Sequence, residues 1–324
     1  MKMENQTSWF SNGNLIISGE YFVLSGAKAL AVPLKFGQEM KVDSFNNNSN
    51  TIQWKTKVLG KPWFEAAFSC KDLSIKNSSD KATASYLQEL LTTIRKIQPG
   101  FISKKESHLI KCEIDFNLSW GWGSSATLIS NLANYAGVDP FVLNRMVSSG
   151  SGYDIAASLA RGPVFYQLNE ENNETTPVAF NPPFKEFIWF LYLGRKQSTS
   201  SSIEKNLKSV KKNKNLIPLI TDLTGKMASE ENLKEFIRII TEHEKVISKA
   251  LKMEKIRDRY FSDLDGEIKS LGAWGGDCVM VVSSLNETVI KQYFRKKGFD
   301  TIFRFDEIIK SNYNYGEVRK NIVA

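Results

Sequence analysis

A turn of glycine and serine residues stands between two patterned runs in the first half of the sequence. Residues 121–126 are Gly-Trp-Gly-Ser-Ser-Ala; an alternating apolar run from His108 precedes them, and a run with helical spacing follows from Thr127. The first run predicts a strand and the second an amphipathic helix. Glycines let the backbone approach a ligand closely, and the free N–H groups of a helix N-terminus attract phosphate. A plain helix start after a tight turn gives the same pattern, and the ending of a Walker A loop is missing, so both interpretations stay open.

A second glycine turn carries an acidic residue. Residues 150–156 are Gly-Ser-Gly-Tyr-Asp-Ile-Ala, which predicts a turn that enters a helix, with Asp154 in the first turn of that helix. An acid at this position can simply interact with the positive end of the helix dipole. It can also accept the proton of a reacting hydroxyl group. Because of the motif around it, we favour the catalytic role as a hypothesis.

The composition limits the kinds of protein to consider. The chain has 324 residues, a formal net charge of +8, three widely spaced cysteines and two histidines, which predicts neither a disulfide framework nor a zinc cluster nor a serine-type triad. No apolar run approaches the ~20 residues that span a bilayer, and the first residues lack the apolar core of a signal peptide. We therefore expect a cytoplasmic protein without a membrane partner. The basic clusters suit a small anionic ligand, and they lack the interleaved aromatic residues of a nucleic-acid surface, so we expect no nucleic-acid partner.

Hydrophobic patterns predict an α+β chain with two domains. The first third is rich in strand patterns, including one at residues 21–24, and a helix is predicted for residues 81–97. Residues 169–183 are polar and acidic and contain three prolines, which is typical of a linker. Helices and strands occur on both sides of this linker, so we predict two α+β domains, residues 1–175 and 176–324.

The second predicted domain begins with a buried strand at residues 187–193. We expect His243 at the solvated surface of a helix, and Cys278 in the core at the head of an apolar strand. The other expected elements are helices at residues 202–211, 216–227, 233–251 and 288–297, and a last strand at residues 301–305.

Four glycine segments in a definite order resemble the motifs of the GHMP kinase superfamily, which includes galactokinase, homoserine kinase, mevalonate kinase and phosphomevalonate kinase. They are residues 13–21 (Gly-Asn-Leu-Ile-Ile-Ser-Gly-Glu-Tyr), 121–126, 150–156 and 269–278 (Lys-Ser-Leu-Gly-Ala-Trp-Gly-Gly-Asp-Cys). The Gly-Glu-Tyr ending of the first segment, together with the third and fourth segments, is most similar to phosphomevalonate kinase. The resemblance covers nearly the whole chain.

This resemblance implies a two-domain α+β fold, with an N-terminal domain similar to domain 2 of ribosomal protein S5 and a ferredoxin-like C-terminal domain. It implies a kinase that uses ATP and Mg²⁺ and transfers the γ-phosphoryl group to a small anionic acceptor. The favoured acceptor is 5-phosphomevalonate, in the mevalonate pathway of isoprenoid biosynthesis. Such a reaction depends on positioning and on cationic or dipolar groups. Mevalonate kinase, or another GHMP kinase with a different acceptor, is the first alternative, and either a monomer or a homodimer is expected.

The matching positions imply roles for particular residues. Asp154 matches the catalytic residue, and Ser125 matches the Mg²⁺-binding serine. For Glu20, a buried acid that is paired within the fold is the alternative to a ligand contact. The implied ATP and phosphate contacts are Gly121, Gly123, Ser124, Ser125 and Ala126. The implied substrate contacts are Glu20, Tyr21, Ser151, Lys196, Ser198, Gly272 and Gly275.

Two positions depart from the family pattern. Asn14 stands where the family usually has a lysine, and residues 143–147 contain no acid where the family tends to have a Mg²⁺-binding glutamate. Losing one electrostatic contact of this kind can cost roughly 10²–10³ in rate. A GHMP-fold protein that binds ligands without phosphoryl transfer is therefore an alternative from a different functional class. The tryptophans that we expect nearest to a ligand are Trp122 and Trp274.

Overall fold

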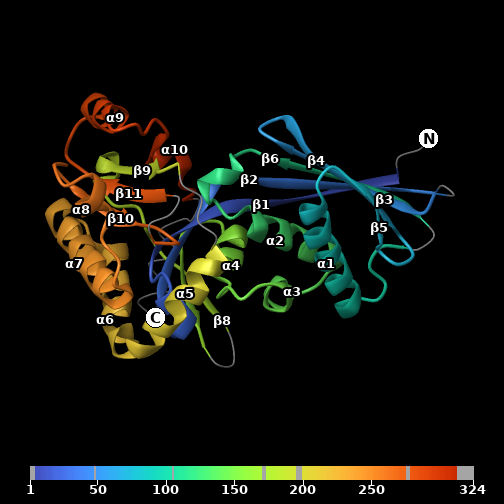
Figure 1. Cartoon of the computed structure of the whole chain (residues 1–324), viewed down its shortest axis with the longest axis horizontal. Coiled ribbons are helices and arrows are strands. Elements are labelled where there is room, and N and C mark those ends of the chain that lie inside the picture. Colours follow the sequence, from blue (N-terminus) through green and yellow to red (C-terminus); the bar gives the residue numbers. More distant parts are fainter. Residues whose placement is uncertain are drawn as a thin grey trace. The chain divides into compact units, whose positions relative to one another are not determined.

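The computed structural model describes residues 4–46, 49–103, 106–169, 173–194, 199–274 and 278–311. The chain divides into two compact units, and many of their helices and strands are labelled in Figure 1. β1 (Glu4–Ser18) pairs with β2 (Ala29–Phe45), and both strands contribute residues to both units, so no single cut in the sequence separates the units. The domain boundary at 175/176 stays a prediction. Unit 1 comprises Met1–Gly13, Phe36–Leu118 and Trp122–Leu159, and unit 2 comprises Asn14–Lys35, Ser119–Gly121 and Ala160–Ala324.

Unit 1 is built on a mixed sheet with the strand order β5-β4-β3-β6-β2. β3 and β6 run parallel, and the other neighbouring strands run antiparallel. Along β3 and β6 every second side chain is buried, as expected for strands with one face toward a core. The strands not yet introduced are β3 (Thr51–Val58), β4 (Lys61–Ser69), β5 (Ile75–Ser78) and β6 (Ser107–Ile114).

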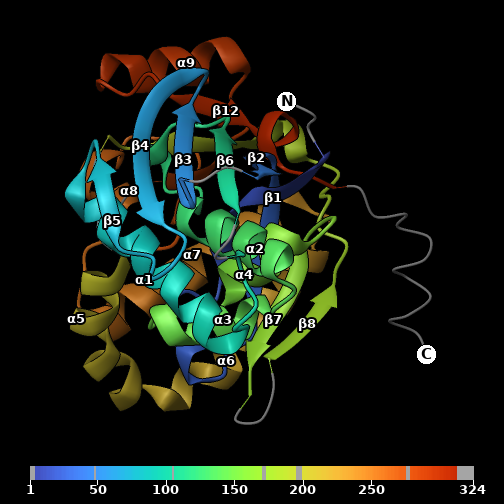
Figure 2. The ribbon, with the colours of Figure 1, turned by 90° about the vertical axis from the view of Figure 1, so that its right-hand side faces the viewer.

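Four helices cover the core face of this sheet (Figure 2). α1 begins and ends at the predicted residues, and Asp80 caps it by accepting the N–H of Thr83. The common core includes Trp54, Leu87, Leu90, Ile110 and Leu132. The helices are α1 (Lys81–Ile97), α2 (Ser124–Ala136), α3 (Pro140–Val147) and α4 (Tyr153–Leu159), and the short helix η2 (Leu118–Trp120) precedes α2.

Unit 2 contains a four-stranded antiparallel sheet with the order β10-β11-β9-β12. Helices lie between β9 and β10 in the chain, and α9 (Glu287–Lys296) lies between β11 and β12. The first and third strands of the chain order are thus the central pair, which is the ferredoxin-like βαββαβ topology that we expected for the second domain. The strands are β9 (Ile188–Tyr192), β10 (Glu267–Ser270), β11 (Cys278–Val282) and β12 (Ile302–Arg304).

The connection from β9 to β10 is helical, and α7 within it has the predicted bounds. A buried group of apolar side chains from these helices also includes residues near the N-terminus of the unit, such as Phe22 and Ala27. Among the described residues, none of the helices is both long and apolar enough to cross a bilayer. The helices of this unit not yet introduced are α5 (Thr199–Lys212), η4 (Lys214–Leu216), α6 (Ile217–Ser229), α7 (Leu233–Leu251), α8 (Ile256–Tyr260), η3 (Lys185–Phe187) and α10 (Phe305–Ile308).

Two elements of unit 2 differ from the prediction. Residues 21–24 lie at and in the 3₁₀ helix η1 (Phe22–Ser25) and form no strand, because Gly19 and Tyr21 have φ values of 91° and 60° and turn the chain just before it. The predicted linker contains the strand β8 (Asn173–Pro177), which pairs with β7 (Val164–Leu168). β8 ends the strand order of its sheet, and an edge strand tolerates the polar residues and the proline that suggested a linker.

We predict opposite effects of alanine at two glycines of unit 2. Gly266 has a φ of 150°, and a Cβ atom there would lie 2.4 Å from the carbonyl oxygen of Val282, so Gly266→Ala should lower the free energy of unfolding by about 1–3 kcal/mol. Gly225 is within α6, and nothing lies within 4 Å of a Cβ atom there, so Gly225→Ala should raise that free energy by about 0.5–1 kcal/mol. Urea unfolding measures both, and a stable Gly266→Ala variant would contradict the close approach of the two backbones.

Candidate functional site

The glycine turn before α2 leaves the start of that helix without a capping side chain. Gly121 and Gly123 have φ values of 71° and 75°, which glycine adopts most easily, and Gly123 is the N-cap residue. Ser124 and Ser125 are therefore the first two helical residues and not N-caps. Because the first N–H groups of a helix have no partner within the helix, this end of α2 is suited to an anion, as predicted for ATP phosphates. Ser125 is exposed, whereas the next residue, Ala126, is buried.

Asp154 lies in the first turn of α4, as the sequence predicted. Its Oδ1 accepts the N–H of Ile155 at 3.0 Å, and burial raises the pKa of its carboxyl group above the usual value. The raised pKa brings the group closer to the range in which a carboxylate is an effective proton acceptor. The preceding residues form the expected turn, since Gly152 has a φ of 93°, and Ser151 is buried.

Tyr86 of α1 contacts one of the predicted residues of this site. Its hydroxyl group lies 2.7 Å from Oγ of Ser125. Burial and the negative charges of Glu89 and Asp154 raise the pKa of Tyr86. Ser125 and Asp154 lie in the first turns of two helices that pack together, since the hydroxyl groups of Ser130 in α2 and Ser158 in α4 are 2.7 Å apart. Sequence analysis missed this polar contact of Tyr86 because the two residues of the hydrogen bond are 39 positions apart.

A second group of predicted residues lies in the interior of unit 2. Glu20 forms a buried ion pair with Lys269 of β10, and Lys269 also lies 3.6 Å from Glu244 of α7. Burial raises the pKa of Glu20, although the ammonium group of Lys269 acts in the opposite direction. The structure thus supports the alternative that we kept open for Glu20, an acid paired within the fold. Lys269 belongs to the fourth glycine segment, but no pattern in the sequence indicates its partner.

The first and fourth glycine segments also contact each other within unit 2. The hydroxyl group of Tyr21 accepts the backbone N–H of Trp274 at 3.1 Å. Gly272 has a φ of 60°, and a Cβ atom there would come only within 4.0 Å of Ile16. The Trp274 side chain is buried in the apolar group of unit 2, and Trp122 is buried between aromatic rings of unit 1. Their proximity to a ligand stays a prediction.

The prediction for His243 was wrong, because this residue is fully buried. It lies on the apolar face of α7, where Phe236, Ile240, Ile247 and Leu251 are also buried. These residues are spaced at the helical period, and position 243 belongs to the same series. The apolar pattern therefore indicates that position 243 is buried. Nε2 of His243 lies 3.7 Å from Oε2 of Glu20, and burial and the charge of Lys269 hold the pKa of His243 well below its usual value. Cys278 is buried, as predicted.

Three predicted substrate contacts are not described by the structure. Lys196, Ser198 and Gly275 lie outside the described residues, so their roles stay predictions.

Asn14 is only 3% exposed, and its amide nitrogen has no hydrogen-bond partner among the described residues. A buried donor without a partner is costly, which makes Asn14 a position where a ligand oxygen would be favourable.

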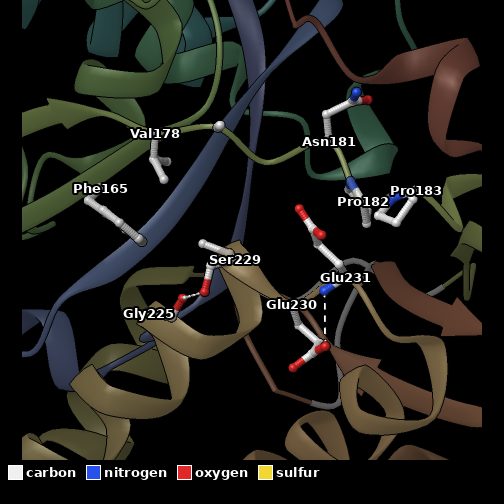
Figure 3. Close-up of a pocket in the computed structure, with 11 residues that line it drawn as sticks. Phe165, Val178, Asn181, Pro182, Pro183, Gly225, Ser229, Glu230 and Glu231 are labelled. Carbon is white, nitrogen blue, oxygen red and sulfur yellow. Dashed lines mark hydrogen bonds between the residues drawn. The ribbon is translucent and has the colours of Figure 1, made fainter. Parts of the chain in front are cut away.

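A pocket of about 550 Å³ in unit 2 does not fit the predicted anionic substrate (Figure 3). Phe165 and Val178 line one side of it, and Glu230 and Glu231 carry the charges among its described lining residues. Two carboxylates repel an anion. None of the predicted site residues that the structure describes lines this pocket, so we assign no role to it in binding that substrate.

Solved structures share the fold of this chain over nearly its whole length. L. major mevalonate kinase in complex with R-mevalonate is 13% identical, with a TM-score of 0.71, and the match covers 96% of this chain and 98% of that chain. Methanococcus jannaschii mevalonate kinase is 16% identical, with a TM-score of 0.68 and coverage of 95% and 99%. Streptococcus pneumoniae phosphomevalonate kinase in complex with phosphomevalonate and AMPPNP is 16% identical, with a TM-score of 0.68 and coverage of 92% and 100%.

These similarities establish the fold. No model of a protein family matches the sequence, and no curated protein matches it. The chain has the α+β fold of the GHMP kinases, as the glycine segments predicted. Within that class, the similar structures include both mevalonate kinases and a phosphomevalonate kinase, so the fold by itself does not select the acceptor.

We predict that Tyr21→Phe destabilises unit 2. The substitution removes the hydroxyl group that accepts the buried N–H of Trp274, and a buried donor without a partner costs about 1–3 kcal/mol. Tyr293→Phe is the matched control, because its hydroxyl group donates to the exposed side chain of Asp263 and its loss should change the free energy of unfolding by about 0.5 kcal/mol or less. Equal losses for the two variants in urea unfolding would contradict a structural role of the Tyr21 hydroxyl group.

Proposed function

We propose that the protein is an ATP-dependent kinase that transfers the γ-phosphoryl group to a small anionic acceptor. The observation that carries this proposal is that α2 and α4, whose first turns contain Ser125 and Asp154, pack against each other, with the hydroxyl groups of Ser130 and Ser158 2.7 Å apart. A helix start suited to phosphate and a proton acceptor are thereby in one region of unit 1. Phosphoryl transfer requires these two components together.

Each component has a distinct part in the proposed reaction. The N–H groups at the start of α2 would bind phosphate oxygens of ATP, with Gly123 giving the backbone its close approach. Asp154 would orient the acceptor hydroxyl group and accept its proton. The exposed hydroxyl oxygen of Ser125 is a hard donor that could be one ligand of a Mg²⁺ ion, beside water and the phosphate oxygens. Mg²⁺ bound by Ser125 would supply positive charge for the phosphates.

We propose 5-phosphomevalonate as the acceptor. The Gly-Glu-Tyr and Gly-Ser-Gly-Tyr-Asp segments favour it, and the similar S. pneumoniae phosphomevalonate kinase was solved with phosphomevalonate and AMPPNP. A net charge of +8 suits an acceptor that already carries a phosphate and a carboxylate. The roles proposed for Lys196 and Ser198 in binding it rest on the sequence resemblance.

A binding protein without phosphoryl transfer is the second candidate. Asn14 favours it, because a buried amide stands where the family usually has a lysine, and an amide supplies no positive charge. The same amide can still donate a hydrogen bond to a ligand. The two candidates therefore differ in turnover and not in ligand binding.

Measurement of ADP release with a panel of acceptors tests the proposal. The panel contains 5-phosphomevalonate, mevalonate, homoserine and galactose, each with ATP and Mg²⁺. We expect turnover with 5-phosphomevalonate. Turnover with a different member of the panel would keep the kinase and replace the acceptor. ATP binding in calorimetry without turnover on any acceptor would favour the binding protein, and absence of ATP binding would reject both candidates.

We predict that Asp154→Asn lowers kcat by roughly 10²–10⁴, the range for loss of a general base, while ATP affinity is kept. The fold should tolerate the change, because burial disfavours the charged carboxylate and an amide oxygen can still accept the N–H of Ile155. Asp139→Asn is the matched control: Asp139 is an exposed N-cap of α3, and asparagine caps equally well, so kcat should not change. Turnover of Asp154→Asn within a few-fold of the wild type would leave Asp154 as a helix-start acid only.

A further inference from the structure

A cluster of ionisable side chains is sealed inside unit 2. Glu20, Glu244 and Lys269 have side chains that are at most 2% exposed, and His243 beside them is fully buried. Lys269 forms an ion pair with Glu20, lies 3.6 Å from Glu244 and donates a further hydrogen bond to the carbonyl oxygen of Ser270 at 3.0 Å. We name these four side chains the buried cluster.

The buried cluster contains one cation and two acids. A buried charge without a partner costs several kcal/mol, so one of the two acids is expected to hold a proton. Glu20 is in direct contact with the ammonium group, whereas Glu244 is 3.6 Å away, so the proton belongs on Glu244. Burial and the negative charge of Glu20 raise the pKa of Glu244 to about 8, in agreement with this assignment. His243 is neutral, because its pKa is held well below the usual value.

Glu20, His243 and Glu244 also have the composition of a metal site, since each offers a ligand atom within 4.8 Å of the others. The ammonium group of Lys269 forms an ion pair with Glu20 and lies 3.6 Å from Glu244. The protein therefore supplies the cation from its own chain, and a divalent ion would have to displace it against charge repulsion. We assign no metal to the buried cluster.

The buried cluster holds one particular turn of the backbone. Residues 19–21 form a turn in which Gly19 and Tyr21 both have positive φ values, and a Cβ atom at Gly19 would lie 2.5 Å from the carbonyl oxygen of Lys28. A non-glycine residue such as Tyr21 adopts positive φ only when surrounding contacts enforce it. The contacts on either side are the ion pair of Glu20 and the hydrogen bond from Trp274 to the Tyr21 hydroxyl group.

We propose that Lys269 and Glu244 are positioning residues for the turn at residues 19–21: Lys269 holds Glu20 in place while Glu244 remains a neutral carboxylic acid, and loss of the Glu244 proton makes two carboxylates compete for one ammonium group. The consequence for stability is independent of the proposed function. The consequence for substrate binding rests on it, since the turn belongs to the first glycine segment, in which the sequence resemblance implies substrate contacts.

Charged groups on the elements that pack against α7 form pairs of their own. On α6, which packs against α7, Asp222 and Lys226 form an exposed ion pair with each other. On β10, Glu267 lies 3.5 Å from Arg257 and accepts a hydrogen bond from Thr241. The charged groups whose effect on Glu244 is resolved are Lys269, which lowers its pKa, and Glu20, which raises it.

Urea unfolding between pH 5 and pH 9 tests the protonation of Glu244. In the folded protein Glu244 keeps its proton up to about pH 8, whereas its ordinary pKa is 4.5, so the folded state binds the extra proton between these values. Stability must then fall as pH rises through this interval, by up to about tenfold per pH unit in the folding equilibrium constant. Glutamine mimics the neutral acid and does not titrate. The ratio of the folding equilibrium constant of Glu244→Gln to that of the wild type should therefore rise by up to about tenfold per pH unit over this interval.

Glu242→Gln is the matched control, because Glu242 is an exposed residue of the same helix and the same chemical change there should leave the pH dependence of the wild type intact. A second variant covers the case in which Glu244→Gln fails to fold. Glu20→Gln leaves one acid and one ammonium group in the buried cluster, so Glu244 should ionise and the fall in stability toward pH 8 should disappear. Identical pH slopes for the wild type and the variant that folds would overturn the proposal.

The positioning role has its own measurement. If ADP release is found with one of the acceptors, the KM for that acceptor should rise in the wild type between pH 7 and pH 9 and stay constant in Glu244→Gln, with kcat at pH 7 equal in the two proteins. An unchanged wild-type KM, or the same rise in both proteins, would refute positioning by the buried cluster. Absence of turnover with every acceptor would reject the kinase and leave the unfolding result to decide the protonation of Glu244.

Discussion

The buried ion pair between Glu20 and Lys269 is the interaction on which the architecture of unit 2 depends. It joins residues 249 positions apart and ties the turn after β1 to strand β10. Removing either partner would leave an uncompensated charge in the interior, which costs about 3–5 kcal/mol in comparable cases. Because a charge pair of this kind adds little net stability relative to apolar packing, its value lies in geometry, since it fixes a turn with two positive φ values.

Burial separates the predicted residues into two kinds. Ser125 is exposed and Asp154 is partly exposed, so both can meet a ligand directly. Glu20 and Lys269 are sealed from solvent, so the role that we propose for them is to position the backbone. A motif match does not distinguish these two kinds of residue. Only the surroundings of a side chain show whether it can contact a ligand or can only position other groups.

The fold and the chemistry of this protein rest on different evidence. Structures that are only 13% to 16% identical share the fold over nearly the whole chain, because apolar patterning and glycine turns can be kept while most side chains change. The acceptor depends on a few polar groups, and a single change such as Asn14 in place of lysine alters the charge at one of them. These structures establish the fold alone, and a fold does not determine the reaction or the acceptor.

The sequence by itself determined the features that depend on neighbouring residues. The bounds of α1 and α7 followed from apolar spacing, and the glycine turns before α2 and α4 followed from residue type, because both are local properties of the backbone. Where a pattern was ambiguous, as in the strand β8 that we took for a linker, local composition was not enough. The contact of Tyr86 with Ser125 and the partner of Lys269 were decided only by the tertiary structure. They join distant segments, and a polar side chain finds its partner through the packing of whole elements and not through its own sequence neighbours.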